Sequence, residues 1–126
     1  DGQCFTSEGI DHYTALLKSS DVVLNIASTV SLEALAVGTP VIHIAIDDKK
    51  TSYYSSNKRF YDYDHIRHLS QFGAIPIVDK KGVLNKTIEQ VLKNDYKKRE
   101  RAMLVSDMVG RFDGANGARL SKEITR

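Results

Sequence analysis

The stretch DVVLNIASTVSLEALAVGTPVIHI, residues 21–44, decides the fold. It opens with a compact β-branched run at Val22–Asn25 and continues with a helix-like segment at Val30–Val37. It ends in a second apolar run, Val41–Ala45, whose last residue follows the quoted stretch. Gly38-Thr39-Pro40 marks the end of the helix, because glycine suits the C-terminal cap and proline cannot continue a helix. Two apolar strands joined by one helix are typical of a parallel crossover unit. The sequence therefore predicts an α/β fold.

Apolar periodicity predicts further elements on both sides of this stretch. Strands are expected at Gln3–Phe5 and Ile75–Val78. Helices are expected at Asp11–Ser20 with Asp11 as its cap, and at His65–Gln71, Val83–Leu92, Asp95–Val109 and Arg119–Ile124. The polar and aromatic stretch Asp47–Asp64 has no such period and is predicted to be a long loop. We therefore expect a Rossmann-like parallel sheet of about four strands, with helices on both faces.

Length and composition limit the classes of protein to which the chain can belong. Its 126 residues, 41% hydrophobic and 27% charged, suit a single domain (1–126) with a real core. The net charge of +2 gives no reason to expect a nucleic-acid partner. Cys4 is the single cysteine, which excludes an internal disulfide framework and fits a reducing compartment. The start without methionine and the low strand count lead us to expect a piece of a longer chain.

The loop between the first central strand and its helix is the candidate binding site. In an open parallel sheet, ligands bind beyond the carboxyl ends of the strands, and Ile26–Thr29 is such a loop. Backbone N–H groups at the start of a helix favour an anion, typically phosphate. Ser28 and Thr29 add two hydroxyl groups there, and Val30 is the first residue of the helix. We expect the backbone of Ser28–Val30 to hold a diphosphate.

Glu33 is the decisive residue of this segment. It lies four residues after Thr29, so it is on the same face of the helix and about 6 Å further along the axis. A capping box would need the carboxylate three residues after the cap, which neither Ser28 nor Thr29 provides. Its neighbours on the helical wheel are apolar. A carboxylate one turn behind a phosphate site suits the hydroxyl groups of a ribose, and the alternative is that Glu33 points into solvent.

The pattern Ser28-Thr29-x-x-x-Glu33-Ala34-x-x-x-Gly38-x-Pro40-Val41-Ile42 resembles the nucleotide-binding motif of two-domain, GT-B-type glycosyltransferases. That motif belongs to their C-terminal, donor-binding domain. The resemblance is specific over residues 21–44. The sequence that follows, through Tyr61–Ile66 and Asp113-Gly114, is more loosely similar to bacterial surface-polysaccharide members of the family, and the similarity is vague after Asp79. It implies half of a GT-B architecture, in which the loop at Ser28 and Thr29 binds the donor diphosphate and Glu33 binds the ribose.

The resemblance also implies the activity and partners of the parent enzyme. A glycosyltransferase of this kind transfers a sugar from a nucleotide-sugar donor, which is a substrate rather than a cofactor, to a glycan or lipid acceptor. Its catalytic base normally comes from the N-terminal domain, so no catalytic residue is assigned here. We expect a cytoplasmic location. Association of the parent enzyme with the inner face of the membrane is an open alternative. The alternatives are a sugar-nucleotide 2-epimerase and a non-catalytic Rossmann-like module.

Other polar residues carry weaker signals. Asp62-Tyr63-Asp64 has the form of a metal-binding triplet, and His65 and His68 are one turn apart, but neither is a convincing site and no metal is predicted. His43 lies in an apolar strand and is expected to be a satisfied core histidine.

Three further features concern surfaces and partners. The aromatic side chains gathered in 53–63 are expected to flank the ligand or to pack against a missing domain. The run Lys97–Arg101 is expected to be the solvated face of a helix, with a polyanion or membrane contact as the alternative. The low strand count predicts an exposed apolar surface or open strand edge, through which the fragment could self-associate.

Overall fold

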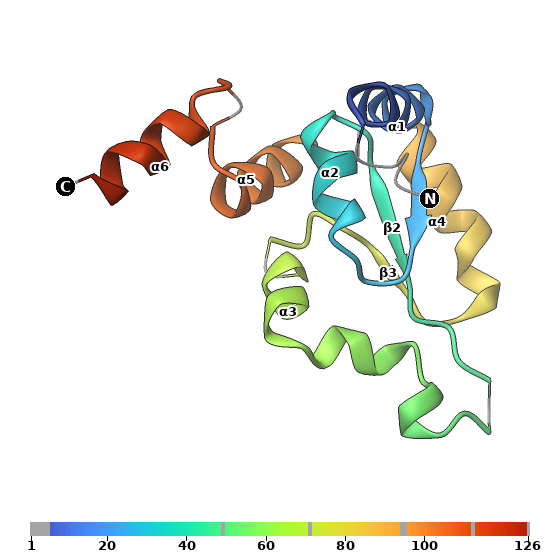
Figure 1. Cartoon of the computed structure of the whole chain (residues 1–126). Coiled ribbons are helices and arrows are strands. Elements are labelled where there is room, and N and C mark those ends of the chain that lie inside the picture. The colour runs from blue at the N-terminus through green and yellow to red at the C-terminus, as the bar shows by residue number, and fades with distance from the viewer. Residues whose placement is uncertain (1–5, 49, 71, 94–95, 112, 126) are drawn as a thin grey trace.

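Eleven elements follow one another in the computed structural model, which describes residues 6–48, 50–70, 72–93, 96–111 and 113–125 (Figure 1). The first half contains α1 (Ser7–Ser19), β1 (Val23–Asn25), α2 (Val30–Ala36), β2 (Val41–Ile44) and the short 3₁₀ helices η2 (Tyr53–Ser55) and η3 (Lys58–Asp62). The second half contains α3 (Asp64–Ser70), β3 (Ile77–Val78), α4 (Lys81–Lys93), α5 (Lys98–Met108) and α6 (Asn116–Ile124). The mixed α/β class predicted from the sequence is confirmed.

The sheet is parallel, with β2 in the centre. The strand order is β1-β2-β3, and Val23 pairs with Val41 while His43 pairs with Ile77. The parallel direction of these three strands was therefore predicted correctly, and each overlaps its predicted range, although β3 spans only Ile77–Val78 of the predicted Ile75–Val78. The prediction of about four strands was wrong for the described residues, which contain three. The fourth predicted strand, Gln3–Phe5, lies outside those residues, and the described chain beyond β3 forms only helices.

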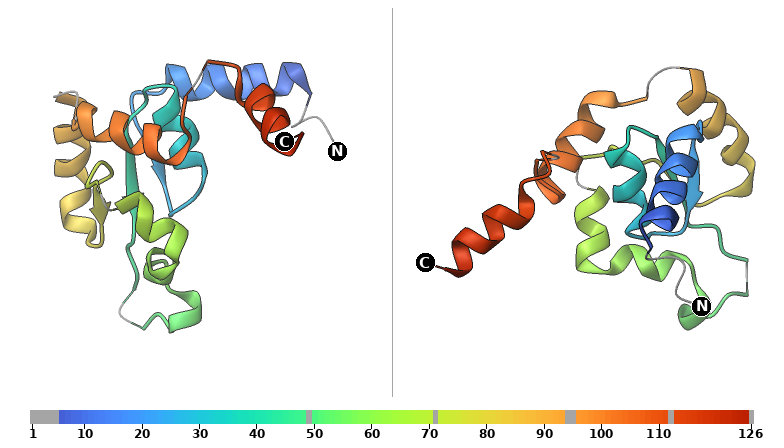
Figure 2. Two further views of the ribbon diagram at one scale, coloured as in Figure 1. Left: turned by 90° about the vertical axis from the view of Figure 1, so that its left-hand side faces the viewer. Right: turned by 45° about the horizontal axis from the view of Figure 1, so that its top comes forward.

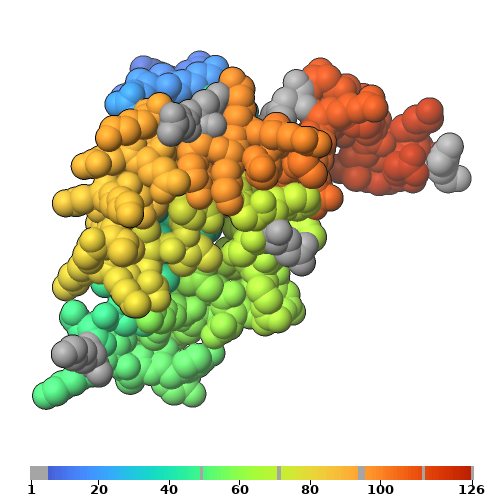
Figure 3. Space-filling view, turned by 180° about the vertical axis from the view of Figure 1, so that it is seen from behind, coloured from blue at the N-terminus to red at the C-terminus, as the bar shows by residue number. Residues whose placement is uncertain are grey.

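Helices cover both faces of the sheet, as predicted. Val41 of β2 belongs to a core cluster with residues of α1, α2, α3 and α5: Leu17, Ala34, Leu35, Ile66, Leu69 and Leu104. Ile42, the next residue, points to the opposite face and packs with Val78 and with Val91 of α4. Figure 3 shows the molecule from behind, where α4 forms much of the surface. The alternation along β2 is the expected period of two for a strand buried on both sides.

The end of α2 fixes the connection into β2. Gly38 has a φ of 94°, a conformation that costs an L-residue energy and suits glycine. Its N–H donates to the Leu35 carbonyl at 3.0 Å, and the Thr39 N–H donates to the Ala34 carbonyl at 2.9 Å. These two bonds form a Schellman motif, and they end the helix at the place where the Gly38-Thr39-Pro40 signal predicted that it stops.

The start of α1 differs from the prediction. The helix begins at Ser7, and the Thr6 side chain caps it by accepting from the Gly9 N–H at 3.1 Å. Asp11 lies inside the helix and is not its cap. Exposed Ile10 explains the error, because the apolar period of the buried face begins only at Tyr13 and Leu17.

The segment between β2 and α3 is more ordered than the predicted long loop. Asp47 accepts hydrogen bonds from the Ser56 hydroxyl at 2.5 Å and the Asn57 N–H at 2.7 Å. The Asn57 side chain donates in turn to the Ile46 carbonyl at 3.0 Å. These bonds hold the turn that leads from η2 into η3, so this segment is not structureless.

The C-terminal helix α6 projects away from the body of the molecule (Figures 1 and 2). It begins at Asn116, earlier than the predicted Arg119, and each of its residues is exposed. Leu120 and Ile124 are 63% and 74% exposed. Across the described ranges, none of the helices combines the length and the apolar character needed to cross a membrane.

Candidate functional site

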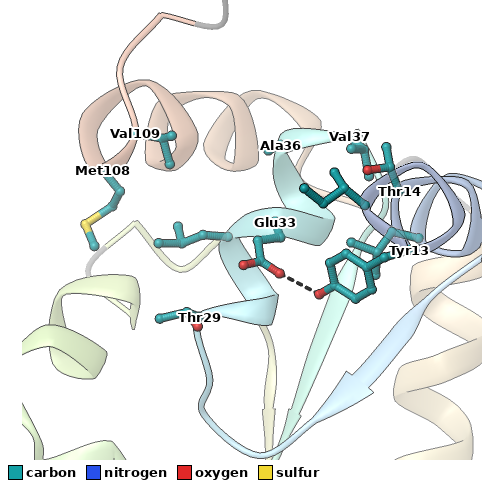
Figure 4. A pocket seen from close by; sticks show the side chains of 11 residues that line it. Tyr13, Thr14, Thr29, Glu33, Ala36, Val37, Met108 and Val109 are labelled. Carbon is teal, nitrogen blue, oxygen red and sulfur yellow. Dashed lines mark hydrogen bonds between the residues drawn. The ribbon is translucent and has the colours of Figure 1, made fainter. Parts of the chain in front are cut away.

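A pocket of about 740 Å³ lies between α1, α2 and α5 (Figure 4). Its walls are mainly apolar and come from Ile10, Tyr13, Thr14, Leu17, Thr29, Leu32, Glu33, Ala36, Val37, Met108 and Val109. The volume is within the range of small-molecule sites, roughly 300–1,000 Å³. Apolar walls with a few convergent polar groups are also typical of such sites.

Glu33 and Tyr13 form the polar centre of this pocket. The Tyr13 hydroxyl on α1 donates to Glu33 Oε2 on α2 at 2.5 Å, and Figure 4 shows the two side chains pointing toward each other. Glu33 is an exposed residue, so its carboxylate lies on the open side of the pocket rather than in the core. Tyr13 therefore orients the carboxylate without removing it from solvent.

Thr29 and Glu33 line the same pocket, as their four-residue spacing predicted. Ser28 and Val30 are half-buried and are not among its lining residues. The Ser28 hydroxyl accepts from the Val30 N–H at 3.3 Å. The Val30 N–H, which was one of the predicted phosphate donors, is therefore already engaged. Ser28 keeps its own hydroxyl proton, which remains a donor that an anion could use. The structure thus brings Thr29 and Glu33 together and places Ser28 and Val30 beside them.

A buried polar network supports the start of α2 from the sheet. Ser31 and His43 are fully buried and share a hydrogen bond of 2.7 Å between Oγ and Nε2. The Asn25 side-chain amide donates to the same Ser31 oxygen at 3.0 Å. This network links the last residue of β1, the first turn of α2 and the centre of β2.

His43 is neutral in this environment. Burial lowers its pKa to about 4, because the charged imidazolium would lose its hydration. Within the part of the chain that the structure describes, its Nδ1 finds no hydrogen-bond partner. The prediction of a core histidine is therefore confirmed, but the ring is satisfied only through Nε2.

Tyr61, at the end of η3, ties the segment after β2 to the candidate loop. Its hydroxyl donates to the Ile44 carbonyl at 3.1 Å and accepts from the Ala27 N–H at 3.4 Å. Its ring lies 5.5 Å from the His43 ring, centroid to centroid. Sequence reasoning placed Tyr61 in an aromatic loop, but nothing in a local pattern shows that its hydroxyl joins two strand ends.

The other candidate residues do not form a site together. His68 is paired with Asp107 of α5 at 2.8 Å, and His65 stacks on Tyr63 with centroids 6.0 Å apart. The Asp64 side chain is 99% exposed and contacts Arg67 at 3.5 Å. Among residues 6–48, 50–70, 72–93, 96–111 and 113–125, no three His, Cys, Asp or Glu side chains gather as potential metal ligands. Cys4 lies outside the described residues.

Comparison with protein-family models, with characterised proteins and with solved structures gave no match.

Proposed function

We propose that this chain binds the nucleotide-diphosphate part of a sugar donor, as the C-terminal part of a GT-B-type glycosyltransferase. The observation that carries the proposal is the Glu33 carboxylate, which Tyr13 holds at the open side of a pocket of about 740 Å³. A carboxylate with an available oxygen accepts hydrogen bonds from two neighbouring hydroxyl groups, which is what a ribose offers. The short motif from Ser28 to Ile42 supports the same assignment.

In this proposal the ligand lies along α2. The ribose contacts Glu33, and the diphosphate lies toward Thr29 and the Ser28 hydroxyl, one helical turn away. The apolar walls from Leu32, Met108 and Val109 provide contact area for a base. None of the eleven lining residues is a lysine, arginine or histidine. The diphosphate would therefore be held by hydroxyl and backbone donors rather than by an ion pair.

The parent enzyme would transfer the sugar to a glycan or lipid acceptor. Donors at the Ser28–Thr29 loop would stabilise the diphosphate as it leaves, because negative charge develops on it during transfer. A catalytic base would have to come from elsewhere in the parent, since the ionisable side chains that line the pocket are Glu33 and Tyr13, and this proposal uses them for binding. The cytoplasm is the compartment where nucleotide sugars would meet this site.

Thermal-shift screening against UDP, CDP, GDP and ADP, followed by titration calorimetry with the best ligand, tests the proposal. Glu33→Gln keeps the shape of the side chain and removes its charge. We expect a loss of about 1.5–3 kcal/mol in binding free energy, or roughly ten- to a hundredfold in Kd, because a charged hydrogen-bond acceptor is lost.

The matched control is Glu89→Gln on α4, where the carboxylate is exposed and pairs only loosely with Lys93 at 3.9 Å. This variant should bind like the unmodified chain. Equal affinity in Glu33→Gln and Glu89→Gln, or no stabilisation by any of the four nucleotides, would contradict the proposal.

A further inference from the structure

A second, smaller pocket lies where β2 and β3 end. Ile46 and Asp47 follow β2, and Lys81 opens α4 three residues after the end of β3. Together with Asp48, Thr51, Ser55 and Asn57 they enclose about 260 Å³. In Figure 1 the lower end of α4 lies beside the chain that leaves β2. The carboxyl ends of parallel strands are where open α/β sheets bind ligands.

The polar groups of this pocket divide into two sets. Asp47 and Asn57 are already engaged, since Asp47 accepts from Ser56 and from the Asn57 backbone, and Asn57 donates to Ile46. These bonds keep the pKa of the Asp47 carboxyl below its usual range, with the Ser56 hydroxyl as the largest cause. Asp47 is therefore a charged, structural residue that shapes the wall of the pocket.

Asp48 and Lys81 form the second set. Their nearest oxygen and nitrogen are 3.6 Å apart, and both side chains are largely exposed, at 87% and 78%. Such a pair adds little to stability, because water screens it. At that separation each group still has hydrogen-bonding capacity for a ligand. Thr51 contributes a hydroxyl group to the same pocket, and Ser55, which accepts from Ser52 at 3.2 Å, keeps its own hydroxyl proton.

The arrangement selects a class of ligand by charge and size. A phosphate would be attracted by Lys81 and repelled by Asp48, whereas a divalent cation would be attracted by Asp48 and repelled by Lys81. A neutral ligand with several hydroxyl groups can donate to the carboxylate and accept from the ammonium at once. A volume of about 260 Å³ is below the usual range for drug-sized ligands, and fits one small ring.

The neighbouring helix η2 adds an aromatic surface. It contributes Ser55 to the pocket and carries Tyr53 and Tyr54, whose rings pack edge to face at 5.6 Å. Tyr53 and Tyr54 are 61% and 81% exposed and do not line the pocket itself, so a ligand that extends past Ser55 would reach their rings. The C–H face of a sugar ring packs against such an aromatic surface, while its hydroxyl groups turn to polar side chains.

We propose that this pocket at the ends of β2 and β3 binds one ring of a neutral sugar. Asp48 and Lys81 bind its hydroxyl groups, and the tyrosines of η2 cover its apolar face. The proposal does not depend on nucleotide binding at Glu33, because the two pockets share no lining residue.

The test uses the 126-residue chain labelled with ¹⁵N and titrated with methyl glycosides of glucose, galactose and N-acetylglucosamine. We expect at least one of them to cause saturable shifts at the amides of Asp48, Thr51, Ser55 and Lys81. Asp48→Ala should weaken that binding about tenfold, the effect expected for losing a charged acceptor. Tyr54→Ala should also weaken it.

The matched control is Asp64→Ala, which removes a carboxylate that is also largely exposed but lies on α3. It should bind the sugar with unchanged affinity, and the spectra of all variants report whether they fold. Three results would overturn the proposal. The first is that no glycoside shifts these amides, and the second is that Asp48→Ala binds as tightly as Asp64→Ala. The third is that sodium phosphate or magnesium chloride saturates the same amides more tightly than any of the glycosides.

Discussion

Acidification from pH 7.5 to pH 5 should destabilise this protein, because His43 is buried as a neutral ring. Burial lowers its pKa from 6.5 to about 4 in the folded chain. The unfolded chain therefore binds a proton near pH 6.5, while the folded chain resists it until about pH 4. Between these values the unfolded state holds more protons, so the free energy of unfolding falls as the pH falls.

The size of the effect follows from the difference in pKa. A difference of about 2.5 units corresponds to about 3 kcal/mol once the pH is below both values. At pH 5 the loss relative to pH 7.5 is about 2 kcal/mol, because the unfolded chain is then almost fully protonated at this site and the folded chain is not. A domain of this size has roughly 5–15 kcal/mol in total, so the loss is easily measured.

Urea unfolding followed by circular dichroism between pH 7.5 and pH 5 measures this loss. His43→Gln keeps a hydrogen-bonding group near Ser31 and removes the titrating imidazole. Between pH 7.5 and pH 5, the unfolding free energy of this variant should therefore fall by about 2 kcal/mol less than that of the unmodified chain. His65→Gln, which alters an exposed histidine on α3, should keep the full dependence.

Direct titration of the His43 ring protons by NMR in the unmodified chain provides a second measurement, which does not require any variant to fold. A ring pKa near 6.5 would refute the reasoning, as would an unfolding free energy that stays constant from pH 7.5 to pH 5.

Two further variants test how the fold is held together. Gly38→Ala places a side chain at a φ of 94°, and apart from its chain neighbours no described residue comes within 4 Å of the new Cβ. Backbone strain alone should therefore cost about 1–2 kcal/mol in urea unfolding, and an unchanged midpoint would contradict the Schellman geometry. Tyr61→Phe removes the hydroxyl that joins Ile44 to Ala27, so it should lower the unfolding free energy by about 1 kcal/mol and shift the Ala27 amide in NMR spectra. An Ala27 resonance that does not move would show that the bridge is absent.

The central strands and the end of α2 could be predicted because their causes are local. Apolar β-branched runs at 22–25 and 41–45 favour strands by their own composition. The second run forms β2, which is buried between two layers of helices, whereas the first forms the half-buried edge strand β1. Gly38 and Pro40 mark the helix end by their own backbone preferences. Parallel pairing then follows from the single helix between the strands.

The contacts made by polar side chains across the fold were not predictable in this way. The bond between Tyr13 and Glu33 joins residues 20 positions apart, and Tyr13 gave only an apolar signal in the helical period. The order of the segment after β2 depends on Asp47 accepting from Ser56 and Asn57, and 3₁₀ turns leave no long period in a sequence. The pairing of Thr29 with Glu33 was predictable because helical geometry alone brings them together.

The outlying position of α6 has a consequence for how the molecule unfolds. A nine-residue helix whose residues are all exposed gains little from burial, and helices of this length are marginal in water on their own. Its amides should therefore exchange with solvent deuterium through local fraying, far faster than those of β2, whose protection requires opening of the whole core. Calorimetry would record the cooperative unit formed by the sheet and its covering helices, while α6 would melt gradually and add no sharp transition.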